Sequence, residues 1–188
     1  MAGKILLMTG DGGECYEVLY AVHRLREAGF VPVIGARSVK RLHLVIHDDE
    51  PGWDTYKERP GYEMNSDIAY KDVKVSDFDA TILIGGRAPE YLRNDPLVLD
   101  ITRQFEKQGK YIFIICHGIQ IAIAAGIIKG KTVTCYEHLK FEIESCGGTF
   151  IDESSHIDGK IVSAKVWADH PKFFANIMAC MSEYNGKR

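Results

Sequence analysis

The sequence predicts an α/β fold in which a mostly parallel sheet is covered by helices on both faces. Short apolar runs of strand length alternate with longer runs in which apolar residues recur at helical spacing. Several short runs are continuously apolar and lead into glycine, as expected of strands buried on both faces. No low-complexity linker interrupts the alternation. Such alternation is typical of a parallel sheet whose crossovers are helices.

The individual elements follow from local patterns. The expected elements are strands at 5–8, 31–34, 80–84, 111–115 and 161–166, and helices at 14–28, 96–108, 118–125 and from Pro171 onward. The first helix places Val18, Val22 and Leu25 on one face. Gly29 then ends it, as glycine commonly does after a helix.

The segment 42–70 breaks the alternation. Its polar and turn-forming residues include His43, His47, Asp48, Asp49, Pro51, Gly52, Pro60 and Gly61. We therefore expect a hairpin or a long loop inserted in the sheet. Ordered loops of this length often border functional sites.

Composition and charge narrow the classes of protein. The 188 residues, 46% apolar and 26% charged, suit one domain that spans residues 1–188. A net charge of −3 gives no basic surface, which weighs against a nucleic-acid partner. Five cysteines argue for reduced thiols in the cytoplasm, because an odd number cannot all pair within the chain. We expect no signal peptide and no membrane partner, since no apolar segment approaches the ~20 residues that span a bilayer.

The predicted topology indicates where a site would form. Ligands bind beyond the carboxyl ends of the strands in open parallel sheets. The segments 11–17, 85–90 and 116–118 each follow a strand, so we expect them to converge at that edge. Gly86 and Gly118 are the expected turn and oxyanion positions there.

Cys116 is the strongest candidate for a nucleophile. It lies in the sequence IICHG, between a buried strand and a helix, where a sharp turn projects the side chain outward. Gly118 keeps the inside of that turn clear of a side chain. The helix N-terminus favours thiolate, the attacking form, and is expected to lower the pKa of this thiol. The alternative is a buried structural cysteine that packs as a small hydrophobic residue.

Four further residues would act beside this thiol, each with a structural alternative. His117 would supply a base or only occupy the turn, because adjacent side chains in an elbow usually diverge. Glu17, or failing that Glu14, would point at the elbow and act as general acid/base. Acids are, however, also favoured in a first helical turn by the helix dipole. Glu90 is ambiguous in the same way, since it would equally cap a short helix begun at Pro89.

The other cysteines, histidines and glycines suggest no cofactor. Those expected to pack or to lie at the surface without a chemical role are Cys135, Cys146, Cys180, His23, His138 and His156. None shows metal-ligand spacing, and the glycine-rich run 10–13 fits neither the dinucleotide nor the Walker pattern. We therefore expect neither a metal nor a cofactor.

Three motifs give the chain a resemblance to a known family. They are ECYE at 14–17, GGRAPEYL at 85–92 and IICHG at 114–118. With these motifs the sequence resembles the ThiJ/PfpI superfamily, which contains parkinsonism-associated deglycase and the PfpI-type intracellular proteases. The similarity covers nearly the whole chain. The insert 45–61 is especially similar to plant members that carry two such domains and are described as glutathione-independent glyoxalases.

The resemblance carries expectations about fold, site and assembly. It implies a flavodoxin-like three-layer sandwich of the class I glutamine amidotransferase type. It also implies that Cys116 is a nucleophile with Glu17 as its carboxyl partner, and it implies no cofactor. In the protease-like branch, Cys116, His117 and Glu90 would form a triad across a subunit boundary. The chain would then self-associate as a dimer or a hexamer.

The sequence departs from the family pattern at three positions. Ile119 follows the elbow glycine where many relatives have proline or glutamine. Cys15 stands where relatives usually have aspartate. Lys172 replaces a glutamate often found after a late His-Pro pair, which weighs against a glutamine amidotransferase triad.

Three functions follow from these residues. The first is a glyoxalase or deglycase that converts small α-oxoaldehydes such as methylglyoxal to hydroxy acids through a Cys116 hemithioacetal. The second is peptide hydrolysis by Cys116, His117 and Glu90. The third is a non-catalytic redox sensor or chaperone that uses oxidation of Cys116, with Cys15 as a second, resolving thiol.

Overall fold

The fold centres on a mostly parallel sheet, as the sequence predicts. The computed structural model describes residues 3–185, and within them the main sheet has seven strands in the order β10-β11-β7-β6-β1-β2-β5. The strands are β1 (Lys4–Met8), β2 (Val31–Ala36), β5 (Ile68–Ala69), β6 (Ala80–Leu83), β7 (Tyr111–Ile115), β10 (Ser155–Asp158) and β11 (Ile161–Ala164). Every neighbouring pair is parallel except β10 and β11.

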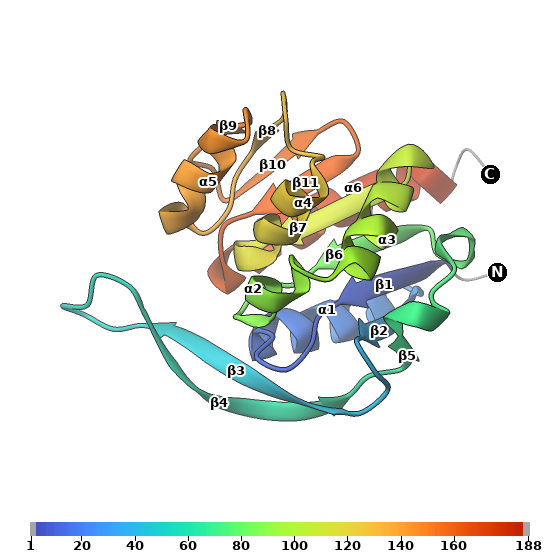
Figure 1. The fold of residues 1–188 in the computed structure, drawn as a ribbon, viewed down its shortest axis with the longest axis horizontal. Coiled ribbons are helices and arrows are strands. Elements are labelled where there is room, and N and C mark those ends of the chain that lie inside the picture. The colour runs from blue at the N-terminus through green and yellow to red at the C-terminus, as the bar shows by residue number, and fades with distance from the viewer. Residues whose placement is uncertain (1–2, 186–188) are drawn as a thin grey trace.

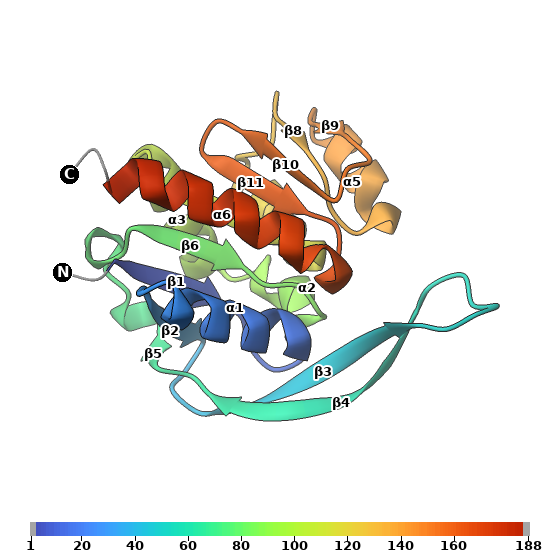
Figure 2. The same ribbon diagram turned by 180° about the vertical axis from the view of Figure 1, so that it is seen from behind.

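Helices cover both faces of this sheet. They are α1 (Cys15–Glu27), α2 (Ala88–Leu92), α3 (Pro96–Lys107), α4 (Ile119–Ala125), α5 (Lys140–Ser145) and α6 (His170–Asn185). Helices α1 and α6 pack on one face, and α3 and α4 on the other (Figures 1 and 2). The expected flavodoxin-like sandwich is therefore confirmed.

Burial on both faces explains the continuous apolar strands. Along β1, Ile5 and Leu7 join the core under α1 and α6, whereas Leu6 and Met8 join the core under α3 and α4. All four side chains are fully buried. Because successive residues of a strand point to opposite faces, a strand between two helical layers must be apolar at every position.

The insert forms a hairpin, but not within the main sheet as expected. Strands β3 (Arg41–Asp49) and β4 (Tyr56–Asn65) pair with each other in a separate antiparallel sheet. The hairpin is anchored on the loop after β1, where Gly12 N donates to His43 O (2.7 Å) and Val45 N donates to Gly13 O (2.9 Å). It therefore extends along the carboxyl edge of the sheet (Figures 1 and 2).

Smaller elements differ from the sequence prediction in three ways. The run 161–166 forms a strand only as far as Ala164, and it pairs with β10, which the sequence analysis missed. Residues 116–118 form a separate single 3₁₀ turn, so the helix expected at 118–125 begins at Ile119. Strands β8 (Thr132–Val133) and β9 (Thr149–Phe150) form a further small sheet.

Among residues 3–185, no helix combines the length and the apolarity that a membrane crossing requires.

The close packing at Gly118 gives a first prediction. A Cβ at this position would lie 2.2 Å from Leu83 O, so Gly118→Ala forces the elbow away from β6. We expect a loss of unfolding free energy of about 3 kcal/mol, as for an overpacked core. Gly159→Ala is the control, because it has a positive φ of 60° but no atom within 4 Å of the added Cβ, and it should cost only about 1 kcal/mol. Urea denaturation measures both; equal losses would contradict the steric account.

Candidate active site

The candidate active site is built around a strained turn at Cys116. This residue follows β7 with a φ of 55°, the one positive value among the described non-glycine residues. Strain of this kind is costly and tends to occur at functional sites. The side chain is only 5% exposed. Gly118 lies against Leu83, which confirms that the inside of the turn has no room for a side chain.

Glu17 meets Cys116, as expected, but from the end of β1, which is separated from β7 by β6 rather than adjacent to it. It lies in the first turn of α1, is 1% exposed, and its Oε2 accepts a hydrogen bond from Gly85 N (2.7 Å). A Cβ on Gly85 would lie 2.7 Å from Cys116 Cβ and 2.8 Å from Glu17 Oε2. Gly85 is therefore the spacer that lets the carboxyl approach the elbow. The sequence analysis gave Gly85 no such role, although two consecutive glycines after β6 indicate a close approach of the backbone to another group.

The electrostatics of this pair differ from the sequence prediction. Burial, followed by the nearby Glu17 charge, raises the pKa of Cys116 well above its ordinary value. The backbone N–H groups of His117 and Gly86 lower that pKa only in part, so the expected net lowering by the helix N-terminus is wrong. Burial is the larger effect because a charge loses its hydration there.

The carboxyl of Glu17 also resists ionisation. Burial, followed by the Glu14 charge, raises the pKa of Glu17 well above its ordinary value. Its hydrogen bonds to Gly85 and Cys116 lower that pKa only in part. The other carboxyl oxygen, Oε1, makes no hydrogen bond to any described residue. The Cys116 thiol is nevertheless close enough to lower the pKa of the Glu17 carboxyl. Because two adjacent buried charges repel, ionisation of either the thiol or the carboxyl opposes ionisation of the other.

His117 turns towards the thiol rather than away from it. Its Nδ1 lies 3.2 Å from Cys116 Sγ, so the two adjacent side chains do not diverge. The ring stacks on Tyr136 (centroids 4.9 Å apart) and meets Tyr56 edge-on (5.5 Å). Burial, followed by the nearby His47, lowers the pKa of His117 to about 4. The imidazole is therefore neutral at pH 7.

Glu14 caps the helix that carries Glu17. Its Oε2 accepts a hydrogen bond from Glu17 N (2.6 Å), and the carboxyl is 1% exposed. Burial raises the pKa of Glu14 to about 7. The cap thus fixes the first turn of α1 and gives Glu14 a positioning role rather than contact with the thiol.

Gly86 provides a backbone donor beside the thiol. It has a φ of 77°, and its N–H stabilises the charged form of Cys116. A Cβ on Gly86 would lie 2.4 Å from both Glu14 N and Gly12 O. Gly86 therefore lies in a turn beside the sulfur, and its role as an oxyanion position stays a prediction.

Glu90 is not hydrogen-bonded to His117 within one chain, although burial, followed by the Glu90 charge, raises the pKa of Tyr56 beside His117. Glu90 lies exposed in the first turn of α2, which carries Pro89 at its start. Among the described residues it makes no hydrogen bond to His117. The structure thus gives it the helix-terminal position that was the alternative to a catalytic role.

The hairpin supplies residues that the sequence analysis left without a role. His47 is buried and stacks on Tyr56 (centroids 3.9 Å apart), and both rings lie beside His117. Thr55 and Tyr136 join the hairpin to the loop after β8 through a hydrogen bond between their hydroxyls (3.1 Å). The histidines of the insert were a sequence signal that it could border a site. Residue spacing cannot, however, predict contacts between side chains more than 60 residues apart in the chain.

Cys15 does not support a resolving role. Its Sγ accepts a hydrogen bond from Tyr62 N of β4 (3.3 Å) and lies against Gly61, so it faces the hairpin. Cys135 and Cys180 are buried, and Cys146 is half-buried. Within residues 3–185, no group of three or more histidine, cysteine, aspartate or glutamate side chains is arranged to hold a metal ion.

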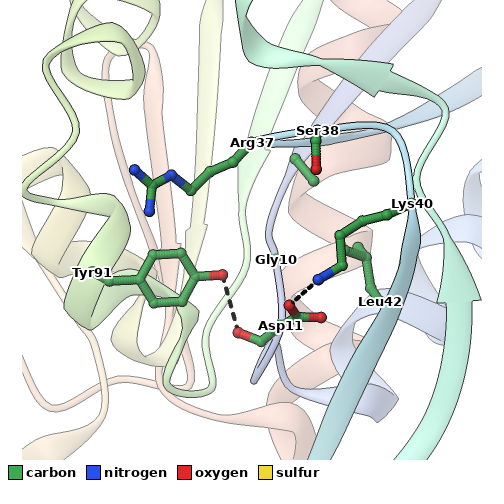
Figure 3. Close-up of a pocket in the computed structure, with 8 residues that line it drawn as sticks. Gly10, Asp11, Arg37, Ser38, Lys40, Leu42 and Tyr91 are labelled. Atoms are coloured by element: carbon green, nitrogen blue, oxygen red, sulfur yellow. Dashed lines mark hydrogen bonds and ion pairs between the residues drawn. The ribbon is translucent and has the colours of Figure 1, made fainter.

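A surface cavity of about 450 Å³ lies apart from this chemistry (Figure 3). Its lining residues are Gly10, Asp11, Ala36, Arg37, Ser38, Lys40, Leu42 and Tyr91. Lys40 pairs with Asp11, and Tyr91 donates its hydroxyl hydrogen to Asp11 O (3.1 Å). Neither Cys116 nor Glu17 lines this cavity. The cavity is therefore not the site of the chemistry considered above.

Comparison with known proteins identifies the family. The model of the DJ-1/PfpI family matches residues 3–180. The chain belongs to the DJ-1/PfpI family. This confirms the resemblance inferred from the motifs at 14–17, 85–92 and 114–118.

Individual members of the DJ-1/PfpI family support the same assignment. DJ-1 homolog D of Arabidopsis thaliana is 35% identical over 95% of this chain, which spans only 47% of that protein. A deglycase of Thermococcus kodakarensis is 33% identical, with 96% of each chain covered. The crystal structure of Drosophila melanogaster DJ-1beta has a TM-score of 0.80 at 22% identity, covers 94% of this chain and 89% of its own, and supports the fold alone. The deglycase name of the second relative, with that of a putative cysteine protease of Bacillus subtilis (29% identical, with 92% of this chain and 95% of that protein covered), supports an enzymatic function of the deglycase or protease type.

The buried cap predicts a pH-dependent stability. Because burial raises the pKa of Glu14 from its ordinary value of 4.5 to about 7, ionising it destabilises the fold as pH rises through this window. Glu14→Gln retains an acceptor oxygen for the cap but cannot ionise. We expect it to match wild type at pH 4.5 and to be more stable at pH 8 by roughly 3 kcal/mol.

Urea denaturation at the two pH values checks this prediction. Glu27→Gln removes an exposed carboxyl from the same helix and serves as the control. It should change stability by the same small amount at both pH values. A Glu14→Gln difference that does not grow with pH would contradict the assignment.

Proposed function

We propose that the chain is a glutathione-independent glyoxalase or deglycase-type enzyme that acts on small α-oxoaldehydes such as methylglyoxal. The single observation that carries the proposal is the buried pair of Cys116 and Glu17, bridged by Gly85. A thiol and a carboxyl in contact supply a nucleophile and an acid/base group without any cofactor. The deglycase names of several relatives support the same class of chemistry.

The first step would be attack of the Cys116 sulfur on the aldehyde carbon. Glu17 would hold the proton that the thiol releases and pass it to the carbonyl oxygen, which gives a hemithioacetal. The raised pKa of Glu17 suits this role, because the carboxyl readily accepts a proton when the thiolate forms. Gly86 N–H would stabilise negative charge that develops near the sulfur.

The second step would move hydrogen between the two carbons of the substrate. Glu17 removes the proton from the former aldehyde carbon to give an enediol, and a proton returns to the adjacent carbon. The product is a thioester of a hydroxy acid on Cys116. Water then cleaves the carbon–sulfur bond, which releases the hydroxy acid and restores the thiol.

The burial of the site favours a small substrate. Cys116 is 5% exposed and His117 is 6% exposed, with Tyr56 and Tyr136 packed against the imidazole. A three-carbon dicarbonyl compound needs far less space than an extended peptide. This enclosure of Cys116 and His117, to which Tyr56 of the hairpin contributes, therefore supports a glyoxalase over a peptidase.

Lactate formation from methylglyoxal without added glutathione tests the proposal. Cys116→Ala and Glu17→Gln should each lower the rate by at least about a hundredfold, since each removes a group that takes part in bond making. Cys146→Ala is the matched thiol control, because Cys146 Sγ donates to Ile143 O (3.1 Å) at the end of α5, and it should keep wild-type activity. Wild-type rates in both site variants would rule out this chemistry.

A peptidase is the second candidate, and one observation favours it. The distance of 3.2 Å between Cys116 Sγ and His117 Nδ1 is that of a nucleophile and its base. This reading also requires self-association as a dimer or a hexamer, in which Glu90 of one copy serves the site of another. The exposed position of Glu90 is compatible with such an assembly.

Casein cleavage by a highly purified sample separates the two candidates. We expect no cleavage above background, because the thiol is too deeply buried to meet a polypeptide. Cleavage that disappears in Glu90→Ala but persists in Glu106→Ala, an exposed glutamate on α3, would establish the peptidase instead.

A further inference from the structure

A chain of polar contacts leads from the GGRAPEYL segment to a buried histidine of the hairpin. His47 on β3 lies opposite Glu58 on β4, and His47 Nε2 is 2.9 Å from Glu58 Oε2. The same Oε2 is 3.0 Å from Nε of Arg87, which belongs to the GGRAPEYL segment. Glu58 is therefore held from both sides, and it fixes the orientation of the imidazole.

The surroundings of His47 resemble those of a catalytic base more than those of a surface histidine. The residue is 5% exposed, stacks on Tyr56 (3.9 Å) and meets the ring of His117 at 6.3 Å. A carboxylate accepts hydrogen bonds only, so Nε2 carries a hydrogen, and in the neutral ring Nδ1 presents a lone pair. Nδ1 is buried and makes no hydrogen bond to any described residue. Such a nitrogen is costly to bury and is available as a proton acceptor.

The last step of the proposed reaction has no base assigned to it. Glu17 acts in the earlier step, in which hydrogen moves between the substrate carbons. His117 contacts the sulfur directly, and its lowered pKa makes it a weak proton acceptor. Hydrolysis of the thioester nevertheless requires a group that removes a proton from the attacking water.

We propose that His47 is the general base of this hydrolytic step, with Glu58 and Arg87 as its positioning residues. The inference rests on the proposed glyoxalase function. The water oxygen bonds to the thioester carbon while His47 Nδ1 takes one water proton. The carbon–sulfur bond then breaks, the hydroxy acid leaves, and the imidazolium proton returns to the Cys116 thiolate. No oxidant or further reactant is needed, since water supplies both the hydroxyl and the proton.

The same hairpin contains a matched control. His43 Nδ1 lies 3.2 Å from Glu63 Oε1, which reproduces the histidine–carboxylate pair four residues earlier on β3. The His43 side chain is 69% exposed and does not border the elbow. His43→Gln therefore removes an equivalent ion pair from the hairpin without touching the proposed base.

The experiment compares single-turnover and steady-state reactions of full-length wild type, His47→Gln, Glu58→Gln and His43→Gln with methylglyoxal. Steady-state lactate release should fall by about a hundredfold in His47→Gln and at least tenfold in Glu58→Gln. Intact mass should show that both variants accumulate one methylglyoxal equivalent on Cys116. After rapid removal of free substrate, hydroxylamine should release this group as a hydroxamate, which identifies a thioester. His43→Gln should behave as wild type.

Several outcomes would overturn the inference. If His47→Gln lowers adduct formation and lactate release by the same factor, or leaves lactate release unchanged, His47 has only a structural role. Glu58→Gln keeps the test valid if His47→Gln does not fold, because Glu58 is partly exposed and its amide retains most of the packing. If wild type itself forms neither adduct nor lactate, the glyoxalase proposal fails together with this inference. An adduct that turns over normally in both variants overturns the inference alone.

Discussion

The burial of two ionisable groups side by side is the constraint on which the rest of the site depends. Cys116 and Glu17 are both almost inaccessible, and burial raises the pKa of each. Two buried charges at contact distance repel strongly, so ionisation of one group opposes ionisation of the other. The backbone N–H groups of Gly85, Gly86 and His117 offset part of this cost by stabilising negative charge on the carboxyl or the sulfur.

Glycine makes this arrangement sterically feasible. Gly85 separates the carboxyl from the elbow, Gly86 contacts the loop after β1, and Gly118 fits beneath Leu83. In each case an added Cβ would approach another atom to 2.8 Å or less. The strained φ of Cys116 persists because these contacts leave the turn no alternative path.

The hairpin converts an open sheet edge into an enclosed site. It is anchored on the loop after β1 by backbone hydrogen bonds from Gly12 and Val45, and Trp167 Nε1 donates to His47 O (2.8 Å). These contacts place the rings of His47 and Tyr56 beside His117. A single segment of chain thus contributes two aromatic rings to the surroundings of the elbow.

The family resemblance selected Glu17 rather than Glu14 as the carboxyl partner, and the residues alone predicted the helix-covered parallel sheet and the elbow at Cys116. These last two features follow from periodicity and from the rule that parallel strands share a carboxyl edge, which are local or topological properties. Only the tertiary structure decided that the thiol pKa is raised, that His117 faces the sulfur, and that the hairpin leaves the main sheet to cover the site. Burial, side-chain direction and the docking of β3 and β4 depend on residues far apart in the chain, and no local pattern encodes them.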